Sequence, residues 1–157
     1  MTQQYPVQQQ PAREGPVVNA GRLWGGGVAT AAVAALVALV GQLVCENIFD
    51  VKLAAPSALL GRSGDSGVSY PVAAFVLGLL ATGLAHVLLL TAPHPRKFFT
   101  WIIGLCTLAG AALPFGLDIA LNRQVATAAV NLLLGLAIGT LLTAVMASSV
   151  SRTQTLG

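Results

Sequence analysis

Four long runs of apolar residues dominate the chain, and nearly all of its charged residues lie between or outside them. Each run has about 19–23 residues, the length that a helix needs to cross a hydrocarbon core of about 30 Å. In lipid, a helix satisfies its backbone polar groups within one segment. We therefore predict an all-α integral membrane four-helix bundle, with helices at about 23–45, 72–90, 98–117 and 125–146.

Polar segments flank and connect these runs. Residues 1–21 are rich in Gln and Pro and have no apolar period, so we expect a disordered tail there. A four-helix domain over 22–150 and a second tail at 151–157 follow. The link 47–69 is the only long one, and Pro56–Leu60 is a candidate for a short interfacial helix.

Particular residues mark the predicted helix ends. Trp24 and Tyr70 stand where interfacial aromatic residues belong, and Gly25–Gly27 predict a loosened entry turn. Pro114 predicts a kink or an early end of the third helix. Short turns make helices two and three, and three and four, antiparallel neighbours, whereas the long first link leaves the place of helix one open.

Composition supports the membrane assignment. The chain is 55% hydrophobic and 8% charged, with a mean hydropathy of +0.79, whereas soluble domains carry about 25% charged residues. The net charge of +3 does not indicate nucleic-acid binding, because the basic residues are scattered among the membrane segments. They are better explained by membrane orientation.

The basic residues also predict that orientation. The side that carries both termini and the turn 91–97 has five basic residues against one acid, and the opposite side has three against four. The positive-inside rule therefore predicts cytoplasmic N- and C-termini in a multi-pass plasma-membrane protein.

The fourth run contains a stripe of small or weakly polar residues with a period of four. Its members are Thr127, Asn131, Gly135, Gly139 and Thr143. Residues four apart share one helix face, and a G-x-x-x-G pair allows helix backbones to approach closely in lipid. We interpret the stripe as a helix-packing seam, either inside one bundle or between this chain and a second copy or partner.

Ionisable residues within the runs are few. His86 lies near the cytoplasmic end of the second run, at the depth of Thr140 and Thr143. We expect a neutral histidine that is hydrogen-bonded to a neighbouring helix, and a proton relay or metal ligand is the alternative.

A second polar group is predicted near the opposite side of the membrane, at roughly one height. Its members are Gln42, Glu46, Asp118, Arg123 and Asn131. The two acids could bind a cation or pair with Arg123, and the alternative is solvated helix ends. The chain has no H-E-x-x-H, P-loop or G-x-S-x-G pattern, so we expect no catalytic residue, cofactor or metal.

Several short motifs occur in a fixed order along the chain. They are Arg22 before the first helix, Val51–Pro56, Arg96–Trp101, Leu113-Pro114 and Ala126–Asn131. In this order the chain resembles a group of small actinobacterial four-helix membrane proteins of unknown function. The resemblance implies the fold and the host lineage, and no activity. A histidine is frequent in that group where Asn131 stands, so a role that needs an ionisable group there would be missing here.

Three functional hypotheses follow. The first is a small non-enzymatic protein that self-associates or is an accessory subunit of a larger membrane complex. Its expected partners are the lipid bilayer and, in addition, a second copy of the chain or that complex. The alternative is an oligomeric conduit for a small solute or ion, with Gln42, Glu46, Asp118 and Asn131 at its mouth. The third is an intramembrane enzyme that uses His86.

Overall fold

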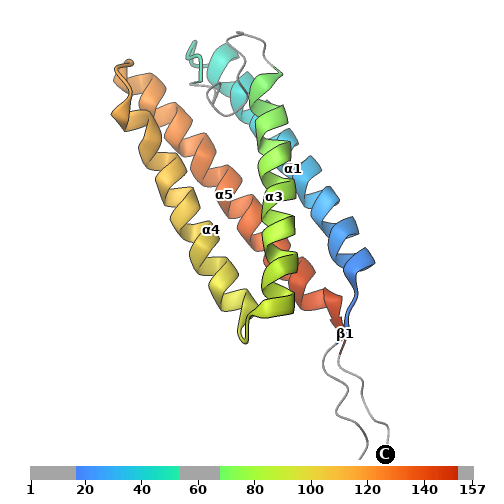
Figure 1. Cartoon of the computed structure of the whole chain (residues 1–157). Helices are drawn as coiled ribbons and strands as arrows, with labels where there is room; N and C mark the ends of the chain where they lie inside the picture. The colour runs from blue at the N-terminus through green and yellow to red at the C-terminus, as the bar shows by residue number, and fades with distance from the viewer. Residues whose placement is uncertain (1–16, 54–67, 152–157) are drawn as a thin grey trace, which may run out of the picture.

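The computed structural model describes residues 17–53 and 68–151, and these ranges form four long helices that lie side by side (Figure 1). The helices are α1 (Ala20–Asn47), α3 (Ser69–Thr91), α4 (Pro95–Ala112) and α5 (Leu121–Ser149). Each is long and apolar enough to cross a membrane, with α4 continued by the 3₁₀ helix η1 (Leu113–Gly116). The predicted architecture of four membrane-length helices is confirmed, and it is that of a multi-pass membrane protein.

Local sequence explains where these helices begin and end. The side-chain oxygen of Asn19 accepts a 3.0 Å hydrogen bond from the backbone N–H of Arg22, which caps the start of α1. Pro95 occupies the first turn of α4, where a missing N–H leaves no bond unmade. α4 ends at Ala112, and Pro114 lies in the 3₁₀ turn, so the predicted early end at this proline is confirmed.

Each helix begins three or four residues before the predicted start, because the polar flanks of the apolar runs are also helical. Residues 17–21, expected in the disordered tail, instead form β1 (Val17–Val18) and the first residues of α1. The rest of that tail, the tail at 152–157 and the interfacial helix expected near Pro56–Leu60 lie outside the described residues.

A short strand pairing joins the segment before α1 to the segment after α5. β1 pairs antiparallel with β2 (Val150–Ser151), in a register that sets Val18 opposite Val150. The backbone N–H of Asn19 also donates to the carbonyl of Ser149 at 3.1 Å. The start of α1 and the end of α5 are therefore held together at one end of the molecule (Figure 1).

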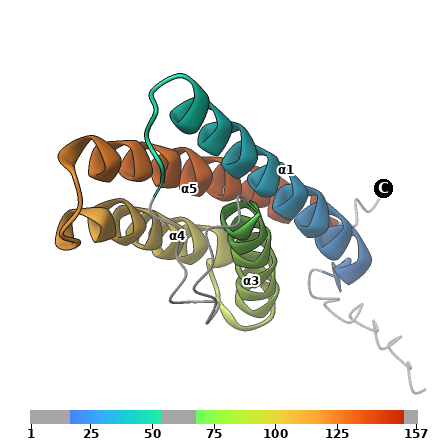
Figure 2. The same cartoon turned by 90° about the horizontal axis from the view of Figure 1, so that it is seen from above.

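The helices do not form a square bundle. α5 lies between α1 and α4, and α1 packs against both α3 and α5 (Figure 2). α3 and α4 are antiparallel, as predicted, but they pack less extensively on one another than α3 packs on α1. The first helix, whose position the sequence left open, thus completes the core.

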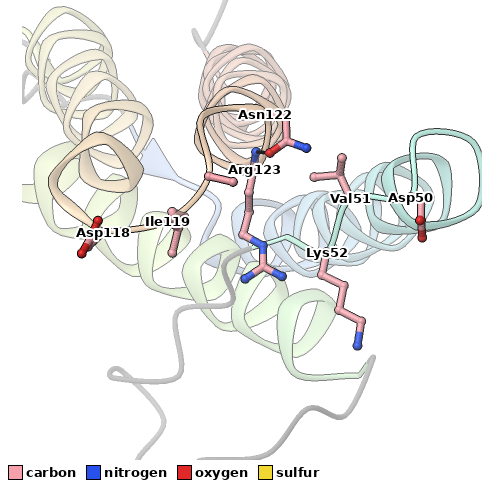
Figure 3. Close-up of a pocket in the computed structure, with 8 residues that line it drawn as sticks. Asp50, Val51, Lys52, Asp118, Ile119, Asn122 and Arg123 are labelled. Carbon is pink, nitrogen blue, oxygen red and sulfur yellow. Dashed lines mark hydrogen bonds between the residues drawn. The ribbon is translucent and has the colours of Figure 1, made fainter.

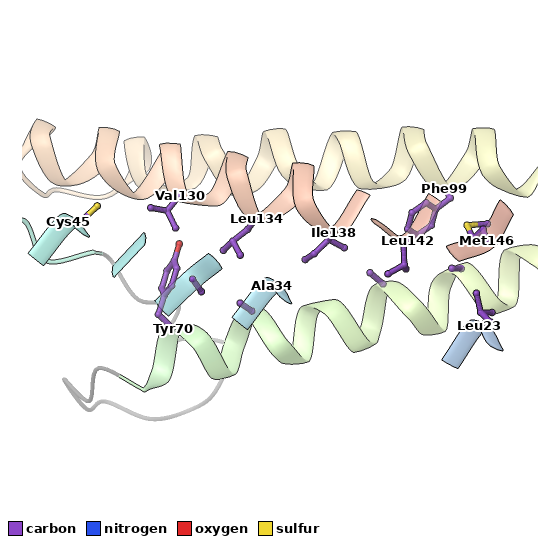
Figure 4. Packing of buried hydrophobic residues seen from close by; sticks show 14 residues of the cluster. Leu23, Ala34, Cys45, Tyr70, Phe99, Val130, Leu134, Ile138, Leu142 and Met146 are labelled. Atoms are coloured by element: carbon purple, nitrogen blue, oxygen red, sulfur yellow. The ribbon is translucent and has the colours of Figure 1, made fainter. Parts of the chain in front are cut away.

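The core changes character along its length (Figure 4). Large side chains fill the end that carries the β1–β2 pairing, where Leu23, Phe99, Leu142 and Met146 are fully buried. Alanines dominate the middle of the α1–α3 interface, and small side chains let these helices approach closely without a hydrophobic drive. The outer surface is also apolar, as lipid contact requires.

Candidate functional site

Asn131 of α5 connects three helices through its side-chain amide. The Tyr70 hydroxyl of α3 donates a hydrogen bond to Asn131 Oδ1, and Asn131 Nδ2 donates to the backbone carbonyl of Gly110 in α4 at 2.7 Å. Both the oxygen and the nitrogen of the amide are therefore hydrogen-bonded, in a helix apolar enough to cross a membrane, where lipid would offer no partner. Each such interhelical bond contributes about 0.6 kcal/mol on average, and up to about 1.7 kcal/mol.

The sequence identified neither of the two hydrogen-bond partners of the Asn131 amide. Tyr70 was predicted at a helix end near the membrane interface, and that depth stays a prediction. The sequence did not indicate that its side chain is buried and that its hydroxyl points toward α5 (Figure 4). Gly110 contributes only its backbone, which no sequence pattern marks. The available signal was Asn131 itself, because an amide within an apolar run must find hydrogen-bond partners.

The predicted seam on α5 packs against α4 of the same chain. A Cβ on Gly135 would lie 2.0 Å from Thr107 Oγ1, and a Cβ on Gly139 would lie 3.3 Å from Ile103 Cγ2. Thr127 is buried and Thr143 half-buried, and each hydroxyl donates to the carbonyl four residues earlier in α5. The two glycines therefore serve packing inside one bundle, the first of the two interpretations offered above.

A second close approach lies between α1 and α3. A Cβ on Gly78 would lie 2.7 Å from the Cα of Ala31, and a Cβ on Gly27 would lie 2.1 Å from Thr82 Cγ2. Gly27 was predicted to loosen an entry turn, but it lies within α1 and is buried against α3. The glycine is required here because α3 occupies the space of a side chain.

His86 of α3 does not make the interhelical hydrogen bond that was expected. Its Nδ1 atom is buried and has no hydrogen-bond partner among the described residues. Thr140 and Thr143 donate instead to carbonyls of their own helix. The imidazole faces the Trp24 ring of α1, with 6.3 Å between ring centroids, so its main contact is aromatic.

Gln42 and Glu46 form a pair on α1. Gln42 Nε2 donates to Glu46 Oε1 at 3.1 Å, one helical turn away. Gln42 is 9% exposed, and its Oε1 atom is buried without a hydrogen-bond partner in the described structure. This pair is separate from Asn131, whose amide is used by Tyr70 and Gly110.

A hollow of about 350 Å³ lies at the end of the bundle opposite the β1–β2 pairing (Figure 3). Its charged lining residues are Asp50, Lys52, Asp118 and Arg123, which come from the segment after α1 and from the start of α5 and the turn before it. In the described ranges, no ion pair joins Arg123 to an acid. The five polar residues predicted at one height are therefore divided among the Gln42–Glu46 pair, the Asn131 bridge and this hollow.

The remaining ionisable groups are dispersed. Both cysteines are free, with Cys45 buried and Cys106 exposed on α4. The part of the chain that the structure describes has no group of three His, Cys, Asp or Glu side chains that could hold a metal ion.

Comparison with known proteins places the chain in a family. A family model matches residues 18–150, so the chain belongs to the family of unknown function DUF6069. The predicted membership of an uncharacterised family is confirmed, and the actinobacterial origin stays a prediction. The matched region begins and ends on Val18 and Val150, which face one another in the strand pairing. No curated protein and no solved structure matches the chain significantly.

Proposed function

We propose that this DUF6069 protein is a non-enzymatic plasma-membrane protein that associates laterally with other membrane helices, as a homo-oligomer or as an accessory subunit of a larger complex. The Arg96-Lys97 turn and the other basic residues on that side support cytoplasmic termini under the positive-inside rule. A reporter that is active only in the cytoplasm tests this orientation when it is fused after residue 157. We expect the fusion to be active.

The exposed face of α4 carries this proposal. The most apolar window of the span that contains α4 is 17% buried, against 28–33% for the other three helices. Phe98, Trp101, Leu105 and Leu108 are exposed and recur on the side of α4 that faces away from α5. A helix attached to its bundle along one side retains a broad face for a neighbouring helix.

The glycine stripe of α5 is excluded as the contact surface with a second chain, which leaves the exposed face of α4. Gly135 and Gly139 are covered by Thr107 and Ile103 of α4, so a second chain would have to displace α4 to reach them. Lateral association through α4 leaves this internal packing intact. The sequence-based hypothesis of self-association is therefore retained, and the surface assigned to it moves from α5 to α4.

Cysteine cross-linking in native membranes tests the proposal. In a Cys45→Ala, Cys106→Ala background, single cysteines would replace Leu105 or Leu108 on α4. We expect oxidation to trap these variants as a dimer, or as an adduct with a partner that mass spectrometry identifies.

Matched controls are provided by Leu36 and Val40, which are equally exposed on α1. Cysteines there should cross-link much less, because α1 is not the contact surface. Equal cross-linking from α1 and α4, or none from α4, would contradict lateral association through this helix.

The conduit alternative is less well supported. The amide oxygen and the amide nitrogen of Asn131 are both hydrogen-bonded within the bundle, and Gln42 donates a hydrogen bond to Glu46. A shared mouth built from these residues and Asp118 would need rearrangement of three separate places. Solute flux into proteoliposomes that depends on Glu46 or Asp118 would favour the conduit over our proposal.

A further inference from the structure

The hollow at the end of the bundle is bordered by four charged side chains that have no partner in the described ranges. Arg123 and Lys52 point to the same side of the hollow, and Asp118 and Asp50 lie at its opposite ends (Figure 3). Two positive and two negative groups leave the rim neutral overall. A ligand that carries both charges therefore matches this set better than a simple anion or a simple cation.

The backbone holds these groups in place. Asp50 adopts a left-handed conformation with φ 52°, which turns the chain after α1. The N–H of Val51 donates to the carbonyl of Cys45 at 2.9 Å, and the Val51 side chain is buried. Lys52 is thereby kept beside the start of α5, where Arg123 lies in the first helical turn.

Phosphate suits the basic half of the hollow. A guanidinium presents a planar fork of donors that matches phosphate oxygens, and Lys52 adds a second positive charge. Arg123 also lies at the N-terminal end of α5, where the helix dipole favours an anion. The carboxylates of Asp118 and Asp50 in turn suit an ammonium group that has N–H donors.

The apolar neighbours of the hollow indicate that the ligand is a lipid. Ile48, Phe49, Leu117 and Leu121 are exposed, and they flank the charged residues in the sequence. Since the ends of membrane-length helices lie near the headgroup region, these side chains are placed to contact acyl chains.

We propose that this hollow binds the headgroup of a phospholipid with a primary ammonium, phosphatidylethanolamine. Arg123 and Lys52 contact its phosphate, and Asp118 or Asp50 accepts hydrogen bonds from its ammonium. This inference requires that the four helices lie in a membrane, and it is independent of lateral association through α4. The cross-linking experiment and a lipid-binding experiment can therefore fail separately.

Native mass spectrometry of the full chain in detergent tests the proposal, with equal amounts of dioleoyl phosphatidylethanolamine, phosphatidylcholine and phosphatidylglycerol added. We expect the ethanolamine lipid to be retained most, because a choline has no N–H and a glycerol headgroup has no ammonium. Arg123→Gln should reduce its retention about five-fold, since one basic residue near the surface contributes about 1 kcal/mol. Asp118→Asn combined with Asp50→Asn should abolish the preference over phosphatidylglycerol.

Arg96→Gln combined with Lys97→Gln is the matched control, because it removes a basic pair at the other end of the bundle. Thermal unfolding followed by circular dichroism confirms that each variant is folded. Equal retention of the three lipids, or equal loss in Arg123→Gln and in the control, would overturn the proposal. Preferred binding of phosphatidylglycerol would overturn it in favour of an anion site. Displacement by soluble glycerophosphoethanolamine at equal concentration would overturn the assignment of a lipid, because it would show that no acyl chain is needed.

Discussion

The α1–α3 and α4–α5 interfaces hold their helices together by different means. Between α1 and α3 the contact is made by small residues such as Ala31 and Gly78, and no side-chain hydrogen bond crosses it among the described residues. Between α4 and α5 the glycine contact at Gly135 is accompanied by the hydrogen bond from Asn131 to Gly110. The first interface depends on shape alone, and the second combines shape with a polar bond.

This difference reflects how the two pairs are positioned. α1 is covered by two helices, so its packing is fixed from two sides, whereas α4 contacts the bundle mainly through α5. A helix that is held along one side can slide or rotate in lipid, because its apolar faces are equivalent there. A directional hydrogen bond opposes that rotation, and we expect the two interfaces to respond differently to substitution.

Gly78→Leu should have the largest effect. The new side chain would meet the backbone of Ala31, which cannot move aside as a side-chain end can. We expect a loss of about 3 kcal/mol in the free energy of unfolding, measured by denaturation with sodium dodecyl sulfate in mixed micelles. Gly83→Leu is the matched control on α3, because a Cβ there has no atom within 4 Å. Equal destabilisation by both would contradict the close approach of α1 and α3.

Gly135→Ala should have an intermediate effect. Its Cβ would overlap the Thr107 side chain, and we expect a loss of about 2 kcal/mol in the same assay. Gly139→Ala should cost less than about 1 kcal/mol, since only Ile103 Cγ2 lies within 4 Å of its Cβ, at 3.3 Å, and this atom is the end of a side chain that can move slightly. Adding Thr107→Gly should restore most of the stability that Gly135→Ala removes. The absence of rescue would place the strain elsewhere.

Asn131→Leu should have a smaller effect on stability than Gly78→Leu or Gly135→Ala and a distinct effect on helix position. It removes two interhelical hydrogen bonds, for a loss of about 1 kcal/mol. Tyr70→Phe removes one of them and should cost about half as much. The double variant should lose no more than Asn131→Leu alone, because the two residues share one bond. Additive losses would show that Tyr70 and Asn131 act independently.

The sequence predicted the features that depend on one helix at a time. Run length identified the spans, Pro114 identified the end of α4, and a period of four identified the Gly135–Gly139 stripe. Rotation of each helix about its own axis could not be predicted, because the lipid-facing and core-facing sides are both apolar. Hence the burial of Tyr70 against α5 could not be predicted from its place at a helix end.

The candidate site was less predictable for the same reason. Depth along the membrane placed Gln42, Asp118 and Asn131 at one height, but it did not indicate which helix faces which. His86 likewise faces Trp24 rather than the threonines at its depth. Lys52 was not linked with Arg123, because the turn at Asp50 that brings them together depends on one residue in a left-handed conformation.

The antiparallel pairing of Val17–Val18 with Val150–Ser151 joins the start of α1 to the end of α5. A force applied to either end of the polypeptide is first borne by these few interstrand bonds, before it reaches the spans.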